Sequence, residues 1–539
     1  MAKQDKFRFR KLDTVGAADA AEDSHYLQNC FLETEDLQVL RDCHNPRRIV
    51  LGRTGSGKTA LLKRLAEVEP RTIEVQPESL ALTYISNSNI LTFISDLGVK
   101  LDIFFKLLWR HVFTVELLKF HFNISTEEGK STFLSWVRSK FGDKKRQHAV
   151  QYLEDWGKSF WLETEYRIKE LTVTLEEDIK NSVKAGVPTF SFSSNDSQKL
   201  SEEQRKEVIS RAQHVVNKVQ IRQLSDIIDL LDDVLDDPHK KYYLTIDRLD
   251  EDWIEDRVRY RLIRALIETV RDFRKVRHVK LVVAIRYDLL DRVFKLTRDA
   301  GFQEEKYESL FLPLEWTKER LGEILDARIN YLVRSRYTTQ SVTNKDILPE
   351  RIKGTQTMDY LLNRTLMRPR DIIVFFNKCI ALATDKPLIT AQMVREAEGE
   401  FSKDRLRALA DEWHADYPNL IDCAMILKGK KSHFAVRDLS AEECGDFCLN
   451  FTINQPPNTD FLSTMASQVA NDILDPKDFR KNSLLVFYRV GLIGLKTESF
   501  QKSNWVSSGR GSVSSAEISD TTRVAVHPAF WRVLGIIQT

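Results

Sequence analysis

A glycine-rich stretch near the N-terminus has the residue types and spacing of a phosphate-binding loop. Residues 52–59 fit the pattern G-x-x-x-x-G-K-[ST], in which the glycines let backbone N–H groups turn toward phosphate oxygens. Lys58 would reach the β- and γ-phosphates, and the Thr59 hydroxyl would ligate Mg²⁺. A chance match in a flexible Gly/Ser loop is the alternative, but an apolar run precedes this stretch and a helical pattern follows it. We therefore predict a nucleotide site formed by Gly52, Arg53, Thr54, Gly55, Ser56, Gly57, Lys58 and Thr59.

A second group of candidate residues follows the apolar run Tyr242–Ile246. Asp247 ends this run, and Asp250 and Glu251 come shortly after it. We predict that Asp247 and Thr59 hold Mg²⁺ and that Asp250 or Glu251 orients the attacking water. The alternative is a surface strand that ends in a solvated acidic turn.

Two arginines are candidates for sensing the γ-phosphate. Arg286 ends the buried-type strand predicted at 279–286, and Arg370 lies at the start of a helix whose first residue is Pro369. Each arginine has an alternative role. Arg286 would cap its strand or pair with Asp288, and Arg370 would pair with a neighbouring acid.

The elements that must position these residues alternate between strand and helix patterns, which favours an α/β fold. We predict a three-layer P-loop NTPase core with helices on both faces of a mostly parallel sheet, together with a large helical insertion, a helical lid and a winged-helix C-terminal domain. The winged-helix prediction depends on a helix at 484–491, a strand at 492–496, a Ser/Gly-rich tip at 504–519, a returning strand at 522–528 and a final helix at 529–534. The predicted segments are an N-terminal extension at 1–45, the core at 46–315 with the insertion at 86–239, the lid at 316–400 and the C-terminal domain at 401–539.

The composition is that of a soluble globular protein, with 42% hydrophobic residues, 30% charged residues and a net charge of +2. The charged N-terminus lacks a signal-peptide pattern, and no uncharged stretch is long enough to span a bilayer, so we expect a cytoplasmic protein without a membrane role. Because the net charge is near zero, any affinity for nucleic acid must come from local patches. The six scattered cysteines contain no C-x-x-C pair, and we expect core thiols rather than a zinc site.

These motifs together resemble the STAND and KAP-like branch of AAA-related P-loop NTPases. The likeness rests on residues 52–59, the strand 244–247 followed by Asp250-Glu251, Arg286, and the segment Arg368-Pro369-Arg370-Asp371. More narrowly, residues 108–111, 247–253, 368–371 and 527–530 are similar to a little-described family of stand-alone bacterial P-loop ATPases. Two features depart from the branch: Arg248 follows the first acid, where NACHT-type relatives have a small residue, and KAP-type transmembrane helices are absent.

The resemblance implies a Mg²⁺-dependent ATPase that works as a conformational switch or signalling ATPase. A role in bacterial antiphage defence, a separate effector protein and a homo-oligomer are further expectations from the same resemblance. A second hypothesis is a DNA-binding ATPase similar to origin-recognition proteins, which would use the winged helix and the arginine-rich helix predicted at 257–277. A third is an ATP-bound scaffold with little turnover.

Overall fold

The computed structural model describes residues 7–77, 101–123, 234–251, 256–298, 303–337, 341–454, 460–498, 503–506 and 513–538, with a few single positions between 135 and 232. The chain divides into two compact units. The sheet unit consists of Thr34–Leu51 and Leu61–Leu312, and the C-terminal unit consists of Met1–Glu33, Gly52–Ala60 and Pro313–Thr539. The predicted phosphate-binding loop, residues 52–59, therefore belongs to the C-terminal unit.

The sheet unit is built on a central five-stranded parallel sheet with the strand order β2-β3-β4-β1-β5. β3 and β4 are buried along nearly their whole length and pair in parallel register, with Leu244 opposite Leu281. Strands that are buried on both faces read as continuous apolar runs, which is why these two were visible in the sequence. The strands are β1 (Ile49–Gly52), β2 (Thr72–Glu74), β3 (Tyr242–Ile246), β4 (Val279–Arg286) and β5 (Phe311–Pro313).

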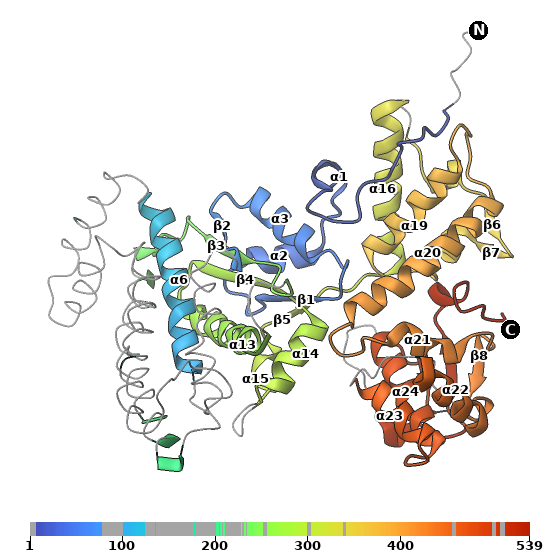
Figure 1. The fold of residues 1–539 in the computed structure, drawn as a ribbon. Helices are drawn as coiled ribbons and strands as arrows, with labels where there is room; N and C mark the ends of the chain where they lie inside the picture. Colours follow the sequence, from blue (N-terminus) through green and yellow to red (C-terminus); the bar gives the residue numbers. More distant parts are fainter. Residues whose placement is uncertain are drawn as a thin grey trace, which may run out of the picture. The chain divides into compact units, whose positions relative to one another are not determined.

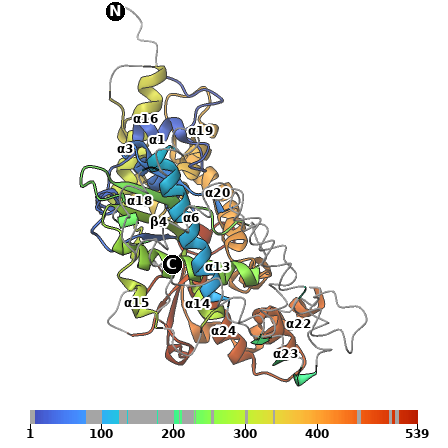
Figure 2. The same cartoon turned by 90° about the vertical axis from the view of Figure 1, so that its left-hand side faces the viewer.

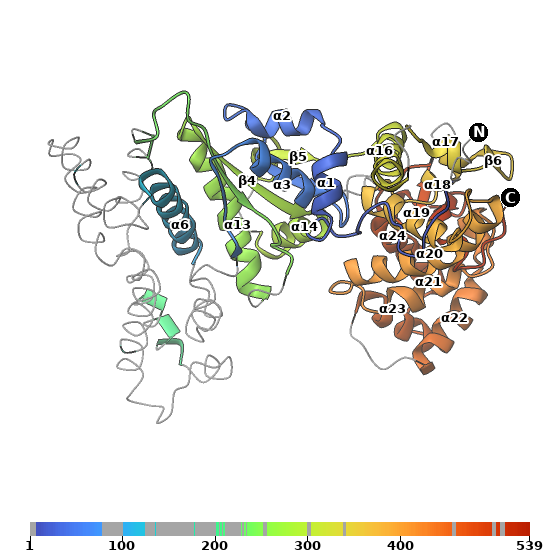
Figure 3. The ribbon, with the colours of Figure 1, turned by 90° about the horizontal axis from the view of Figure 1, so that it is seen from above.

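Helices cover both sides of this sheet (Figure 3). On one side lie α2 (Glu35–Arg41) and α3 (Lys58–Val68), and on the other lie α13 (Asp256–Asp272) and α6 (Asp102–Phe122). α6 packs along α13, where the buried Trp109 donates its indole N–H to the carbonyl of Leu262 at 2.9 Å. Most of the predicted helical insertion, residues 86–239, lies outside the described residues. The remaining elements of this unit are η2 (Phe273–Lys275), α14 (Tyr287–Leu296) and α15 (Glu305–Glu308).

In the C-terminal unit, a group of helices that we call the lid helices shares one apolar core (Figure 1). The N-terminal segment is part of that core, since Phe9 and Val15 are almost completely buried among the lid helices. The lid helices are α16 (Lys318–Arg336), α17 (Asn344–Ile347), α18 (Thr357–Leu362), α19 (Pro369–Leu382) and α20 (Ala391–Glu412), with the small hairpin β6 (Arg351–Ile352) and β7 (Thr355–Gln356) and the N-terminal helix α1 (Ser24–Cys30).

The C-terminal module, residues 413–538, has its own core and a three-stranded antiparallel sheet of order β8-β10-β9. The helices α22, α23 and α24 pack on one another (Figure 2). α24 ends at Val490 and is capped by Gly491, which has φ +87°, and β9 begins at Ile493. The elements are α21 (Leu420–Ala424), η3 (Met425–Leu427), β8 (His433–Ala435), η4 (Val436–Asp438), α22 (Ala441–Asn454), α23 (Phe461–Ala470), α24 (Pro476–Val490), β9 (Ile493–Lys496), η5 (Ser515–Glu517), β10 (Arg523–Val526) and η6 (Pro528–Phe530).

The predicted final helix at 529–534 is wrong, because only the short 3-10 turn η6 forms there. The hydroxyl of Ser402 on α20 donates to the carbonyl of Ala529 at 2.7 Å and accepts from the N–H of Val533 at 3.1 Å. These bonds engage the backbone groups that a continuing helix would need. All six cysteines, Cys30, Cys43, Cys379, Cys423, Cys444 and Cys448, are buried.

Among the described residues, no helix combines the length and the apolar character that a bilayer crossing requires.

Candidate nucleotide site

The loop between β1 and α3 has a backbone that suits phosphate binding. Gly55 and Gly57 have φ values of +78° and +96°, a region that is costly for residues with a side chain. A side chain at Gly52 would place its Cβ only 2.2 Å from the Ser56 hydroxyl oxygen. The glycines are therefore required by the shape of the loop. Lys58 is the first residue of α3 and its ammonium group donates to the carbonyls of Gly52 and Arg53 at 3.1 and 3.2 Å, so it bridges the open side of the loop.

Two hydroxyl groups in the loop fit a polar ligand. Among the described residues, the Oγ atoms of Thr54 and Ser56 are buried and have no hydrogen-bond partner. Buried hydroxyl groups are usually paired, because an unpaired one loses its bonds to water. Together with the N-terminus of α3, where Thr59 is the second residue, these groups are compatible with a bound phosphate and a metal ion.

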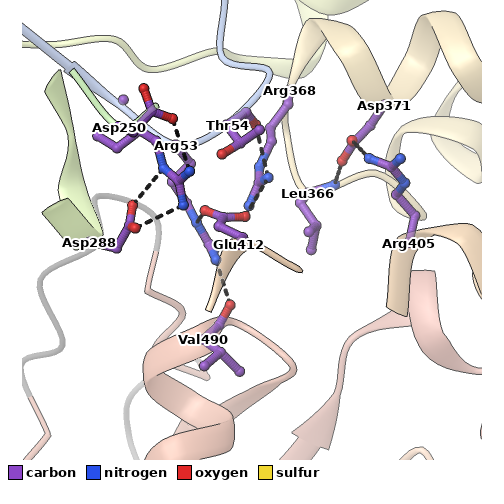
Figure 4. Close-up of polar contacts among 12 residues, drawn as sticks. Arg53, Thr54, Asp250, Asp288, Leu366, Arg368, Asp371, Arg405, Glu412 and Val490 are labelled. Carbon is purple, nitrogen blue, oxygen red and sulfur yellow. Dashed lines mark hydrogen bonds and ion pairs between the residues drawn. The ribbon is translucent and has the colours of Figure 1, made fainter. Parts of the chain in front are cut away.

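The outward carbonyls of the loop are bound by donors from the lid helices and from the segment that leads into them. Arg368 donates through Nη1 to the carbonyl of Thr54 at 2.9 Å, as Figure 4 shows. The backbone N–H of Arg370 donates to the carbonyl of Gly55 at 3.3 Å, and the indole N–H of Trp316 donates to the carbonyl of Ser56 at 2.7 Å. Three successive peptide groups are thus held from one side of the loop.

Arg53, predicted as a nucleotide contact, uses its side chain for a different purpose. Its Nε is 3.2 Å from Glu412 Oε1, and its Nη2 donates to the carbonyl of Val490 at 2.6 Å. Glu412 also binds Arg368, with 3.0 Å between Oε2 and Nη1, so one carboxylate holds two arginines (Figure 4). Sequence reasoning missed Glu412 and Trp316, because nothing in their local pattern points to the loop.

Arg370, a predicted γ-phosphate sensor, packs the stem of its side chain against the loop. A Cβ at Gly55 would come within 2.7 Å of the Arg370 Cβ, and the Arg370 Nε donates to the carbonyl of Ala18 at 2.9 Å. The pKa of Arg370 lies below its ordinary value because the side chain is buried. The nearby Asp19 and Asp371 carboxylates raise the pKa and offset only part of this effect. The side chain therefore lies beside the loop but is bonded to the N-terminal segment, and its sensing role stays a prediction.

In the sheet unit, Asp247 follows β3, as predicted. One of its carboxylate oxygens accepts the backbone N–H of Arg248 at 2.9 Å, and Arg248 has a φ of +60°. Because residues with a side chain rarely adopt this conformation, the turn after Asp247 is strained at that position. Such strain is common at functional sites and is one reason to keep Asp247 as the candidate metal ligand.

Of the two predicted acids, Asp250 pairs with Arg286 and Glu251 pairs with Arg248. Arg286 pairs with both carboxylate oxygens of Asp288, at 2.9 and 2.8 Å, and its Nη1 is 3.0 Å from Asp250. The pairing with Asp288 was one of the two alternatives for Arg286. Glu251 has an exposed side chain 3.6 Å from the guanidinium of Arg248.

Two arginines of α13 are paired within their own unit. Arg259 pairs with Asp256, and Arg264 lies 3.3 Å from Glu268. Both side chains are largely buried, so these two arginines fit a salt-bridged helix better than a surface for DNA.

In comparisons with known proteins, one segment of the chain matches a family model. A family model described as the FunZ-associated C-terminal helical domain matches residues 319–410, which cover the lid helices and less than a fifth of the chain. No curated protein matches the chain. A solved structure, Cdc6p from Pyrobaculum aerophilum, is 12% identical and aligns over 92% of this chain and 89% of that chain, with a TM-score of 0.27. A TM-score this low supports no conclusion about a shared fold.

Proposed function

We propose that the protein is a Mg²⁺-dependent ATPase in which the nucleotide acts on the lid helices and the C-terminal module. The observation that carries this proposal is the loop at 52–59, with its two left-handed glycines, its unpaired Thr54 and Ser56 hydroxyls, and its outward carbonyls bound by Arg368, Arg370 and Trp316. A phosphate on the inner side and lid donors on the outer side would contact the same peptide groups. Occupancy of the loop therefore would affect the lid directly.

The residues divide the chemistry between them. Lys58 and the backbone N–H groups of the loop would neutralise the phosphates, and the Thr59 hydroxyl and the Asp247 carboxylate would hold Mg²⁺. The metal ion supplies charge neutralisation for the phosphate oxygens. Either Asp250 or Glu251 would orient the attacking water, and each is paired with an arginine, Asp250 with Arg286 at 3.0 Å and Glu251 with Arg248 at 3.6 Å. Arg370 and Arg286 report the γ-phosphate.

The biological setting that we propose is a STAND or KAP-like switch in the bacterial cytoplasm. It would serve antiphage defence as a homo-oligomer with a separate effector protein. The motif resemblance supports this setting, and the FunZ-associated C-terminal helical domain lies where the lid was predicted. ATP is favoured over GTP by resemblance alone.

ATP turnover by the full chain tests the activity. We expect Lys58→Ala to abolish ATP binding, because the ammonium group lies at the loop, 3.1 Å from the carbonyl of Gly52, where it would meet the phosphates. We expect loss of the acid that orients the water, by Glu251→Ala or by Asp250→Ala, to lower turnover by about 100-fold or more while ATP stays bound, since a positioned base contributes roughly 100- to 10,000-fold. The variant with the larger loss identifies that acid.

Purified wild-type protein that neither binds ATP nor differs from Lys58→Ala would contradict the proposed activity. Tight ATP binding with negligible turnover would instead favour the ATP-bound scaffold. Size-exclusion chromatography with and without nucleotide tests the proposed homo-oligomer.

The second candidate is a DNA-binding ATPase similar to origin-recognition proteins. One observation favours it: α24 leads into the antiparallel pair β9 and β10, and β8 pairs with the other edge of β10, an order of elements that is compatible with the proposed winged helix. Exposed basic residues on this module include Lys477 and Arg489 in α24 and Arg523 in β10. A salt titration with duplex DNA tests this candidate, and we expect affinity that falls steeply with salt. No measurable binding at low salt would exclude it.

A further inference from the structure

The second residue of the phosphate-binding loop is buried in a cluster of charged groups that reaches into the C-terminal module. Arg53 is only 8% exposed, Arg368 5% and Glu412 7%. A buried guanidinium is costly unless a carboxylate and further hydrogen bonds accompany it. Here Glu412 supplies the carboxylate for both arginines, and the carbonyls of Thr54 and Val490 supply the further bonds.

Glu412 is an unusual last residue for a helix. It ends α20, where the partial negative charge of the helix C-terminus disfavours a carboxylate. Its two bonds to arginines offset that cost. A glutamate at position 412 is therefore explained by its contacts with Arg53 and Arg368 at the loop, and not by a preference of the helix end.

Gly491 completes the contact on the side of the C-terminal module. It has a φ of +87°, and a Cβ at this position would come within 2.7 Å of the Arg53 Nη1. Val490, whose carbonyl accepts from Arg53, is the residue just before it and the last residue of α24. The turn from α24 into β9 thus has the conformation, and the empty space, that the Arg53 side chain needs.

From this arrangement we infer that the C-terminal module is part of the nucleotide site. Glu412 is a positioning residue that holds Arg53 and Arg368 on the loop, and the turn at Gly491 fixes the far end of Arg53. This inference rests on the proposed nucleotide binding and adds its regulation: whatever moves the turn after α24 changes affinity for the nucleotide, and nucleotide binding changes the turn.

The physical link is the orientation of the peptide groups of the loop. A backbone N–H group and the preceding carbonyl belong to one peptide plane and point in opposite directions. Holding the carbonyls of Thr54, Gly55 and Ser56 outward therefore turns the next N–H groups toward the phosphate side. Arg368 is fixed by Glu412 while it makes the first of these bonds, so loss of Glu412 releases one of the three.

A pair of glycine variants in the full chain tests the inference. Gly491→Ala places a methyl group against the Arg53 guanidinium, whereas Gly429→Ala in the same module meets nothing within 4 Å. Both glycines have a positive φ, +87° and +74°, so both variants carry similar backbone strain. We expect Gly491→Ala to weaken ATP binding by about 5- to 150-fold, the usual range of coupling between two sites, and Gly429→Ala to bind like the wild type.

Glu412→Gln is the second variant, because it keeps the shape of the side chain and removes its charge. We expect it to weaken ATP binding within the same range. Amide hydrogen exchange on the wild type supplies a readout that does not depend on any variant. Because coupling is reciprocal, ATP should slow exchange in residues 488–492.

The outcomes separate this inference from the proposed function. If the wild type binds ATP and Lys58→Ala does not, but both Gly491→Ala and Glu412→Gln bind like the wild type, the inference is wrong and the ATPase proposal stands. If the wild type does not bind ATP, the proposed function itself fails. Should Gly491→Ala and Glu412→Gln both prove unfolded by circular dichroism, unchanged exchange in residues 488–492 on adding ATP to the wild type would overturn the inference.

Discussion

Lys280 is a charged residue in the middle of β4 that is completely buried. Its ammonium group donates to the carbonyls of Val39, Asp42 and Asn45, at 2.6, 2.7 and 3.4 Å, and so binds the end of α2 and the chain that follows it. The pKa of Lys280 is lowered from 10.5 to about 7, mainly by burial and next by the neighbouring Arg48, against smaller opposing effects of Cys43 and Asp42.

This shift predicts how stability depends on pH. Between pH 7 and 10.5 the unfolded chain keeps a proton on Lys280 that the folded protein has lost, so the free energy of unfolding rises with pH in this window. The expected slope is at most about 1.4 kcal/mol per pH unit. Urea unfolding of the wild type and of Lys280→Met from pH 7 to 9 measures it.

The difference between the two proteins is the relevant quantity, because other groups titrate in both. We expect the wild type to gain stability relative to Lys280→Met as the pH rises. A difference that is constant over this range would mean that Lys280 stays charged in the folded protein, held so by its three carbonyl partners.

Among the elements, the N-terminal segment is tied to α16 by a buried ion pair. Asp23 and Arg328 are 2.5 Å apart, and their side chains are 3% and 5% exposed. Arg328 also donates to the carbonyl of Val15, and Asp23 accepts the backbone N–H of Ala17. The segment around residues 9–23, predicted only as part of an N-terminal extension, is therefore packed on the lid helices.

Asp23→Asn tests this docking. The variant leaves the Arg328 guanidinium buried without its carboxylate, and we expect a loss of about 3 to 5 kcal/mol in the free energy of unfolding. Glu22→Gln, at the exposed neighbouring position, is the matched control and should change stability by less than about 0.5 kcal/mol. Equal stability of the two variants in chemical denaturation would show that the segment is not anchored through Asp23.

The elements that were predicted well from the sequence are those whose residue pattern is determined locally, by burial of the element itself or by the residue at its first position. β4 was predicted with its observed bounds, Val279–Arg286, because a strand covered on both faces is apolar throughout. α19 begins at Pro369 as expected, since proline at the first helical position loses no hydrogen bond. The helix expected at 529–534 failed because Ser402, on another helix, binds its backbone.

At the scale of the whole molecule, the residues of the site that were predicted are those with a local sequence pattern, and those that were missed depend on contacts between distant parts of the chain. The glycines, Lys58 and Asp247 were identified from local spacing. Glu412 was not, because it lies 359 residues from Arg53 and only the fold brings the two together. The division of the chain follows the same logic, since residues 52–60 belong to the compact unit formed mainly by residues 313–539 and not to the unit of the strand that precedes them.

The bond between Arg53 and Val490 also has a consequence for protein synthesis. The two residues are 437 positions apart, and at about 5 to 20 residues per second a ribosome needs roughly 20 to 90 s to pass from one to the other. The loop therefore lacks the partner of its second residue until a further 437 residues have been synthesised. On our inference, a nascent chain cannot bind ATP at full affinity before Val490 has left the ribosome.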